Sequence, residues 1–327
     1  MINPSNSILL FNDHVIDCSD KFILFGQYLE EHFSARDIKY LALKNKLKET
    51  VSTRVILHRK RNDFYMVISD SKDLKQNKYD LYLKQVLIAC DITLKTPFGT
   101  LSQKDEQLPS SIITMVQNYS NRITEWIEYN IKLGFSQIII FDNNSTDNTS
   151  ARINGINNPR VIAYAFNYEP LEGQHWSNIQ RMQLTIGKMA LEGKVDWLCF
   201  IDADEFIYLP KMQQPNINDF LDQRKYKRAK ALRIESILLT NKAQDDLIEN
   251  NILKLCRHSD LTAKYTKLII NSKLTRKNTF MKSPHKMRGD SILRKEDIYH
   301  GHCWCNQRLE YVDSMEQLDV LYNFFKS

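Results

Sequence analysis

Apolar runs alternate with segments of helical spacing between residues 111 and 201, and this alternation constrains the fold more than any other feature. In two segments, 123–134 and 177–193, apolar residues recur every three or four positions, as in a helix that covers a sheet. Continuous apolar strands between such helices indicate a mostly parallel sheet that is buried on both faces. The predicted strands of this α/β fold are 111–118, 137–141, 161–166 and 196–201.

The first hundred residues show a different pattern. Two segments, 53–70 and 79–95, are typical of short strands separated by polar turns, and 21–50 has the composition of one or two helices. A stretch rich in Pro, Gly and Ser then resembles a linker. We predict a smaller β-rich accessory region at 1–108 and an α/β region at 109–327.

Charge is distributed unevenly along the chain. The net charge is +6, and residues 254–295 contain twelve Lys and Arg against two Asp. Such a segment either forms solvated loops and helix faces or attracts anions such as phosphates and acidic lipids. No basic motif is interleaved with aromatic residues, so we do not expect nucleic acid as a partner.

Membrane insertion and secretion are not predicted. No apolar run approaches the roughly 18–20 residues of a membrane-spanning helix, and the first residues lack the basic start of a secretory signal. We expect a cytoplasmic protein. Peripheral contact with the anionic inner face of a membrane, through the basic segment, is a further hypothesis.

Three carboxylates, Asp202, Asp204 and Glu205, directly follow the apolar run 196–201. Ligands gather at the carboxyl ends of the strands in a parallel α/β sheet. In extended backbone Asp202 and Asp204 would point to the same side, with the small Ala203 between them. Paired carboxylates without soft ligands suit Mg²⁺ or Mn²⁺. The alternative is an acidic turn that caps the next helix.

Asp142 and Asn143 stand at the carboxyl end of a second predicted strand. Their side chains have the hydrogen-bonding groups to bind a base edge or ribose hydroxyls. Ser145, Thr146 and Asp147 follow directly and are typical N-cap residues for a helix. Ligand binding and capping use different atoms, so the two interpretations are compatible.

Several motifs together resemble the GT-A glycosyltransferases of the family 2-like and family 92 groups. They are "WIEYNIKLGFSQIIIFDNNSTDNT", then "WLCFIDADEF", and then "KLIINSKLTRKNTFMKSPHKM" with "IYHGHCW". His285, His300 and Gln180 stand at matching places. The resemblance covers about 110–305, and 1–108 has no comparable match. It implies the GT-A fold, a Rossmann-like sandwich of nucleotide-diphospho-sugar transferases.

The resemblance also implies a donor, a cofactor and their ligands. The donor is a UDP-sugar, and Mn²⁺ or Mg²⁺ is held by Asp202 and Asp204, approached by His300 or His302. The expected acceptor is a carbohydrate or a lipid-linked glycan, as in polysaccharide or lipooligosaccharide biosynthesis. In the basic segment, Lys267 or Lys282 would supply counter-charge to the diphosphate. The implied donor-binding set is Val116, Gln117, Asp142, Asn143, Gln180, Asp202, Lys267 and Lys282.

The groups that this chain resembles mostly invert at the anomeric carbon, in one displacement assisted by a general base. The base must face the side of the sugar opposite the leaving group, so neither metal-binding aspartate can serve. Glu205 is close, and it is either a structural carboxylate or a helper for the acceptor. The later candidates for the base are Glu235, Asp245 and Asp246.

Two other classes of function remain open. The chain has Gln117-Asn118-Tyr119 where the resembled families have Lys-Asn-Glu. This difference is consistent with an alternative function, that of a glycan-binding protein that has lost catalysis. Another metal-dependent nucleotide-phosphate enzyme, such as a nucleotidyltransferase, is the second alternative. It would need a glycine-rich phosphate loop, and the chain contains nine glycines and no such loop.

Overall fold

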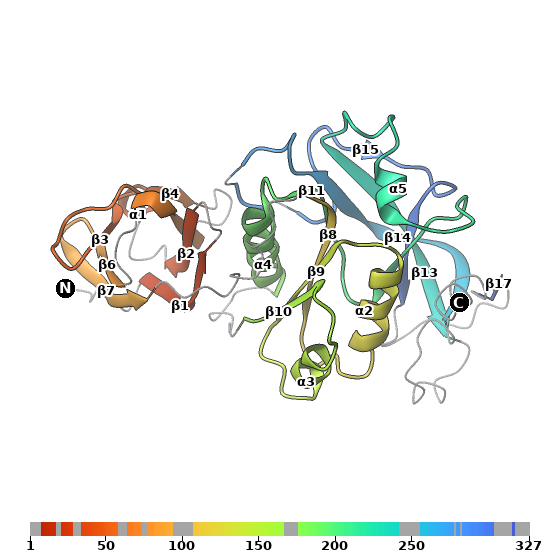
Figure 1. Cartoon of the computed structure of the whole chain (residues 1–327), viewed down its shortest axis with the longest axis horizontal. Coiled ribbons are helices and arrows are strands. Elements are labelled where there is room, and N and C mark those ends of the chain that lie inside the picture. Colours follow the sequence, from red (N-terminus) through yellow and green to blue (C-terminus); the bar gives the residue numbers. More distant parts are fainter. Residues whose placement is uncertain are drawn as a thin grey trace. The chain divides into compact units, whose positions relative to one another are not determined.

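The chain forms two compact units, Met1–Asp105 and Glu106–Ser327. Figure 1 shows the computed structural model, with most of its elements labelled. The two units are described separately. The residues that the structure describes are 8–17, 21–28, 34–57, 64–73, 78–93, 107–166, 176–241, 256–277, 279–281, 283–303 and 316–317.

The smaller unit contains two antiparallel sheets, with strand orders β1-β2-β5-β4 and β3-β6-β7. Side chains from both sheets share one core, to which Leu24 and Val67 contribute from one sheet and Leu43 and Leu81 from the other. The β-rich character predicted for this region is confirmed. Its elements are β1 (Ile8–Asp17), β2 (Lys21–Tyr28), α1 (Ala35–Ile38), β3 (Leu41–Lys44), β4 (Arg54–Leu57), β5 (Phe64–Asp70), η2 (Ser71–Asp73), β6 (Lys78–Leu83) and β7 (Val86–Thr93).

The helical prediction for 21–50 is wrong for most of its length. β2 occupies its start and pairs with β1 and β5 on either side, so the run Ile23-Leu24-Phe25 is buried within a sheet. Among the described residues of this segment, only the single turn of α1 is helical, and a capping box between Ser34 and Asp37 fixes its start. Pairing with distant strands overrode local propensity here.

Asp80 is a buried carboxylate of the smaller unit, 3% exposed. Its oxygens accept hydrogen bonds from Lys46 Nζ at 2.8 Å, Lys48 Nζ at 3.1 Å and the Asp91 N–H at 3.0 Å. The hydrogen bond from Lys46, aided by the Asp91 N–H and Lys48, lowers the pKa of Asp80 to about 2, although burial works in the opposite direction.

This lowered pKa predicts a specific acid sensitivity. The folded state keeps Asp80 ionised more strongly than the unfolded state, so the stabilisation is complete above about pH 5 and is lost as the pH falls from about 4 to about 2. We expect Asp80→Asn to be less stable than the wild type at neutral pH, and the gap to close over that acid range. Urea unfolding at a series of pH values measures it; a gap that stays constant down to pH 2 would contradict the assignment.

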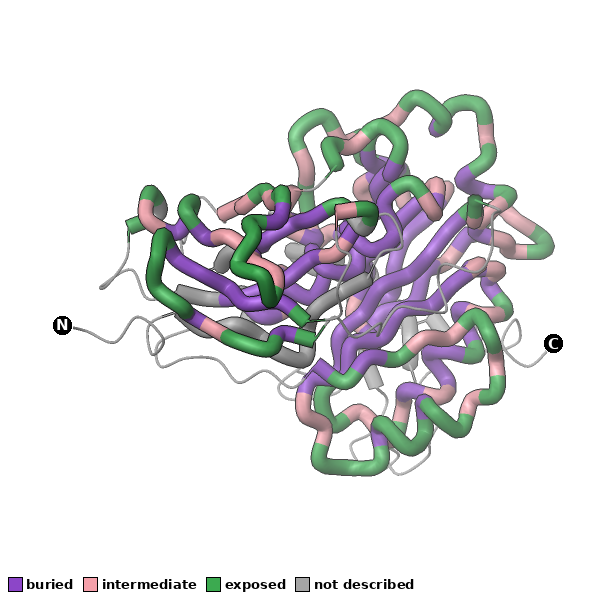
Figure 2. Tube along the Cα trace, turned by 60° about the vertical axis from the view of Figure 1, so that its left-hand side comes forward, coloured by how far each residue is buried: buried purple, intermediate pink, exposed green. Residues whose placement is uncertain are grey.

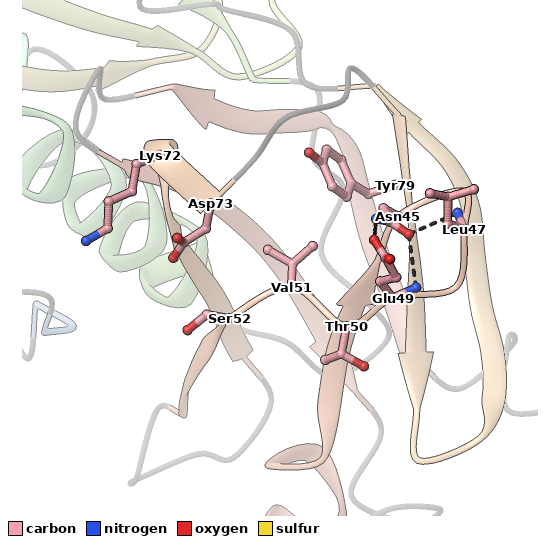
Figure 3. A pocket seen from close by; sticks show the side chains of 9 residues that line it. All are labelled: Asn45, Leu47, Glu49, Thr50, Val51, Ser52, Lys72, Asp73 and Tyr79. Carbon is pink, nitrogen blue, oxygen red and sulfur yellow. Dashed lines mark hydrogen bonds between the residues drawn. The ribbon is translucent and has the colours of Figure 1, made fainter.

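A pocket of about 610 Å³ opens in the smaller unit. Figure 3 shows that Asn45 and Glu49 hydrogen-bond to each other beside it, at 2.6 Å between Nδ2 and Oε2. None of its residues belongs to the predicted donor, metal or base set. The lining residues are Asn45, Leu47, Glu49, Thr50, Val51, Ser52, Lys72, Asp73 and Tyr79.

The larger unit is built on one sheet with the strand order β10-β9-β8-β11-β14-β13-β16-β12. The first four strands pair in parallel, which confirms the predicted α/β fold with a mostly parallel sheet. β14 then pairs antiparallel with both β11 and β13. The strands are β8 (Leu108–Val116), β9 (Gln137–Asp142), β10 (Val161–Ala165), β11 (Val195–Phe200), β12 (Glu205–Tyr208), β13 (Ala231–Asn241), β14 (Cys256–Asn271), β15 (Ser291–Ile292), β16 (Tyr299–Cys303) and β17 (Glu316–Gln317).

Helices cover both faces of the parallel strands. β9 is buried throughout, β8 and β11 are buried over most of their length, and β10, at the edge of the sheet, is partly exposed (Figure 2). On one face Ile112 of β8 shares a core with Trp126 of α2. On the other face Gly187 of α4 lies so close to the sheet that an added Cβ would stand 3.0 Å from Ile113. Glycine at 187 therefore permits the close approach of α4. The helices are α2 (Ile123–Lys132), α3 (Thr149–Asn154), α4 (Trp176–Leu191) and α5 (Ile217–Leu221).

The sheet curls back on itself at one end. β12 begins five residues after β11 ends, yet it pairs with β16, which lies beyond β14 and β13 in the strand order. The chain can do this only if the far strands return toward the carboxyl end of β11. In the part of the chain that the structure describes, no helix is long and apolar enough to cross a membrane.

Candidate active site

The three carboxylates form a tight turn at the carboxyl end of β11. The Glu205 N–H donates to the Asp202 carbonyl at 3.1 Å, which closes the turn, and β12 starts at Glu205. The backbone is therefore not extended between Asp202 and Asp204, as the prediction that they point to the same side assumed. Asp204 is half-buried, and the Asp202 side chain is 37% exposed.

Two side chains from neighbouring elements hold the Asp202 carboxylate. Gln180 of α4 donates from Nε2 to Oδ1 at 2.7 Å, and Lys267 of β14 donates from Nζ to Oδ2 at 2.5 Å. Gln180 was predicted as a donor-binding residue, and the structure places it on Asp202. The Asp202 carboxylate is thus fixed from two directions and still reaches solvent.

Glu205 lies behind the turn and completes an ion-pair network. Its Oε2 is 2.9 Å from Lys267 Nζ and accepts the Asp202 N–H at 3.0 Å. The side chains of Glu205 and Lys267 are each 2% exposed. In an extended backbone Glu205 would point away from Asp202, but the turn brings its carboxylate to the Asp202 N–H. This position matches the structural alternative for Glu205.

Lys267 keeps its positive charge in this network. Burial disfavours the Lys267 ammonium, but the carboxylates of Glu205 and Asp202 outweigh it and raise the pKa of Lys267 above its ordinary value, so the ammonium persists. A buried ammonium therefore lies directly behind the exposed carboxylate of Asp202.

The two predicted histidines occupy different positions. His300 of β16 is fully buried, and its Nδ1 lies 3.6 Å from Oε1 of Glu205. The His285 Nδ1 lies 2.7 Å from the Thr266 carbonyl, one residue before Lys267, and burial lowers the pKa of His285. No group of three or more His, Cys, Asp or Glu with the spacing of a metal site occurs among the described residues.

The end of β9 supplies the second predicted cluster. The Asn143 N–H donates to the Val116 carbonyl at 2.8 Å, so the ends of β8 and β9 lie together. Asp142 is 5% exposed, and its carboxylate accepts the Ser145 N–H at 3.2 Å and the Ser150 hydroxyl. The Asn143 Oδ1 accepts from Gln183 Nε2 at 3.3 Å. Both side chains are built into the carboxyl edge of the sheet.

The loop after β9 bonds to the loop after β8. Asn118, with a φ of 53°, donates from its N–H to Ser145 Oγ at 2.9 Å and accepts the Thr146 N–H at 2.8 Å. Capping by Ser145, Thr146 and Asp147 was predicted. The N-cap is Asn148, whose side chain makes no cap hydrogen bond, and the Asp147 carboxylate accepts the N–H of Thr149, the first residue of α3. Asn118 was not predicted as a residue that links the two loops. The signal in the sequence is the Asn itself, because Asn tolerates the left-handed conformation that this position adopts.

Asp147 links the same two loops. Its carboxylate accepts the Thr149 N–H at 2.9 Å and the Ser120 N–H at 3.1 Å. Desolvation opposes ionisation, but these hydrogen bonds lower the pKa of Asp147 to about 2. Gln117, at the tip of the loop, is exposed. The two loops therefore form one cross-linked rim beside the carboxyl ends of β8 and β9.

The candidates for the base are only partly placed. Glu235 is half-buried on β13, at an irregularity in its pairing with β14, and lies opposite Tyr299 of β16. Its neighbour Ile234 is the register partner of Lys267. Asp245, Asp246 and Lys282 lie outside the described residues, as does the side chain of His302.

Helix α2 holds the start of β12 through two side-chain hydrogen bonds, which were not predicted from the sequence. Trp126 Nε1 donates to the Glu205 carbonyl at 2.9 Å, and the Tyr129 hydroxyl donates to the Ile207 carbonyl. Both residues belong to the helix predicted at 123–134. Their polar atoms also fix the start of β12.

A carboxylate turn that follows a central parallel strand, in a sheet that curls back over it, defines a fold of the GT-A class. The model of glycosyltransferase family 92 matches residues 110–304, which is more than half of the chain. The chain belongs to this family, and the predicted resemblance is confirmed.

Curated relatives of the family align over part of the chain. A family 92 protein of Ricinus communis is 31% identical over 101 residues, which cover 30% of this chain and 17% of the relative. One of Oryza sativa subsp. japonica is 26% identical over 102 residues, covering 31% and 16%. The matched segment therefore spans about a sixth of each relative's length.

A solved structure shows a weaker likeness. Glucosyl-3-phosphoglycerate synthase from Mycobacterium tuberculosis, in complex with Mn²⁺, UDP and glucosyl-3-phosphoglycerate, is 17% identical, with a TM-score of 0.27. The alignment covers 44% of this chain and 48% of that chain.

Proposed function

We propose that this chain is a metal-dependent glycosyltransferase that moves a hexose from a UDP-sugar to a carbohydrate or lipid-linked acceptor by a single inverting displacement. One observation carries the proposal: Asp202 presents a 37% exposed carboxylate at the carboxyl end of β11, held by Gln180 and the buried Lys267. This is where a parallel α/β sheet binds its ligand. Membership of glycosyltransferase family 92 supports the class of reaction.

The donor atoms at the turn fit a hard divalent cation. Asp202 and Asp204 would hold Mn²⁺ or Mg²⁺, which are usually bound by one or two carboxylates together with substrate phosphates. When bound, the cation would stabilise the charge that develops on the departing diphosphate. His300 faces Glu205, so we assign the protein's cation ligands to the two aspartates alone.

The remaining roles follow from position. Asp142 and Asn143, at the carboxyl edge of β9, with Val116 and the exposed Gln117 beside them, would border the nucleoside. Glu235 is the described candidate for the base, because it is half-buried on a strand next to the one that carries Lys267. A base in this position would accept the proton of the acceptor hydroxyl.

Exposed basic residues are consistent with two proposed partners, an anionic acceptor and an anionic membrane surface. They follow β14 in the segment whose basic charge was noted in the sequence. Their charge would attract a phosphorylated or lipid-linked acceptor at a cytoplasmic membrane face. Flotation with vesicles containing anionic lipid tests this part, and absence of binding would remove it. The residues are Lys273, Arg276, Lys277, Lys286 and Arg288.

A donor screen tests the proposed reaction. UDP-, GDP- and CMP-sugars are incubated with the protein, with Mn²⁺ or with EDTA, and release of the nucleoside diphosphate or monophosphate is measured. We expect UDP release that requires Mn²⁺. Thermal shifts with the same compounds show whether a nucleotide sugar binds without turnover.

Two further measurements, with glycans and with a nucleoside triphosphate plus a sugar phosphate, distinguish the alternatives and would contradict the proposal. Binding of glycans without turnover of any donor favours the glycan-binding alternative, which the Gln117-Asn118-Tyr119 sequence supports. Release of pyrophosphate from a nucleoside triphosphate and a sugar phosphate would favour the nucleotidyltransferase alternative.

A further inference from the structure

We infer that Lys267 is a positioning residue: its buried ammonium, bonded to Glu205, holds the Asp202 carboxylate in the orientation that receives a divalent cation. The inference rests on the proposed function, because it assigns a role to a residue behind the proposed cation site. It also replaces the expectation that Lys267 meets the donor diphosphate directly.

The position of Lys267 excludes direct contact with a bulky substrate. Its side chain is 2% exposed and extends from β14, in the middle of the sheet. The ammonium lies 2.5 Å from Asp202 Oδ2 and 2.9 Å from Glu205 Oε2. Lys267 therefore acts on the solvent side of the molecule only through Asp202.

The contacts of Asp202 leave room for a cation. A carboxylate has about four acceptor positions, two on each oxygen. Gln180 uses a position on Oδ1 and Lys267 uses one on Oδ2. The side chain is still 37% exposed, so the remaining positions reach solvent. Carboxylates that ligate metals are commonly held in this way by hydrogen bonds from a second layer of residues.

Glu205 explains how an ammonium can be kept in this place. A buried charge is costly unless it is paired and hydrogen-bonded. Glu205 has the same 2% exposure and also accepts the Asp202 N–H, so it fixes both the backbone and the lysine. The competing explanation is that Lys267 only neutralises Glu205. Removing both charges together separates the two explanations.

The experiment uses the full chain with Lys267→Met alone, Glu205→Gln alone, and both together. Mn²⁺ binding is measured from the EPR signal of free Mn²⁺, with and without UDP, and stability is measured by urea unfolding in EDTA. We expect Lys267→Met alone to be strongly destabilised, because it leaves the Glu205 charge buried and unpaired. The double variant should recover most of that loss, yet bind Mn²⁺ about 10- to 100-fold more weakly than wild type.

The single Glu205→Gln variant retains Lys267 beside Asp202, and it should bind Mn²⁺ more tightly than the double variant. A matched control comes from the other end of α4, where Lys188 and Glu192 form a second buried ion pair, with side chains 2% and 1% exposed. Lys188→Met/Glu192→Gln removes the same charges far along the helix from Gln180. It should bind Mn²⁺ as the wild type does.

Either of two results would overturn the inference. Unchanged Mn²⁺ affinity in the folded double variant would mean that Lys267 only neutralises Glu205. Tighter binding would mean that Lys267 competes with the cation for Asp202. Both differ from failure of the proposed function, in which the wild type itself turns over no nucleotide sugar or shows no binding of Mn²⁺ with UDP.

Discussion

Replacing Asp202 by Asn is expected to lower kcat for UDP-sugar turnover by about a thousandfold or more. The amide keeps the shape of the side chain and an oxygen for Lys267, so the change removes charge and leaves the packing in place. Loss of the stabilisation that a bound cation gives to the leaving group amounts to several kcal/mol, and each 1.36 kcal/mol is about tenfold in rate. Steady-state kinetics with saturating Mn²⁺ and urea unfolding measure the two effects separately.

Asp196 offers a matched control on the same strand. It is also 37% exposed and pairs with a lysine, Lys273, at 2.8 Å, but it stands at the amino end of β11. Asp196→Asn should leave kcat within about twofold of wild type, because Asp196 lies at the opposite end of β11 from the carboxylate turn. Its loss should also lower the unfolding free energy little, because an exposed ion pair contributes about 1 kcal/mol or less to stability. If Asp202→Asn keeps more than a tenth of the activity, or if Asp196→Asn loses as much, the assignment of Asp202 is wrong.

Trp126→Ala is expected to destabilise the larger unit by about 3–5 kcal/mol. The side chain is fully buried in the core between α2 and the sheet, and its removal leaves a cavity. The indole also holds the Glu205 carbonyl, so the turn that carries Asp202 loses a support. Urea unfolding followed by tryptophan fluorescence and circular dichroism gives the change in unfolding free energy.

Trp126→Phe separates packing from the hydrogen bond. Phe keeps most of the apolar volume but leaves the Glu205 carbonyl without the indole donor, which costs about 1–3 kcal/mol. The order of stability should therefore be wild type, Phe, then Ala. Equal stability of the Phe variant and the wild type would show that the hydrogen bond to Glu205 is unimportant for the turn.

Much of the larger unit was predictable because its signals are local. The alternation of strand and helix between 111 and 201 predicted β8, β9, β10 and β11, and all four are present and parallel. Continuous apolar runs form buried strands because their backbone groups pair and both faces pack under helices. The same reasoning failed for 21–50, where an apolar run became β2 because strands on both sides were available to pair with it.

The position of the site's carboxylates could be predicted from a local pattern, since a charged run directly after a buried strand must emerge at the carboxyl end of that strand. The contacts that these carboxylates make depend on the three-dimensional arrangement of the sheet. The turn closes onto β12, and the curled sheet brings Lys267 from β14 against both Asp202 and Glu205. Residues so far apart along the chain meet through strand order and curvature, which no local pattern encodes. Asp202 thereby remains exposed at the surface, while Glu205 becomes its buried support.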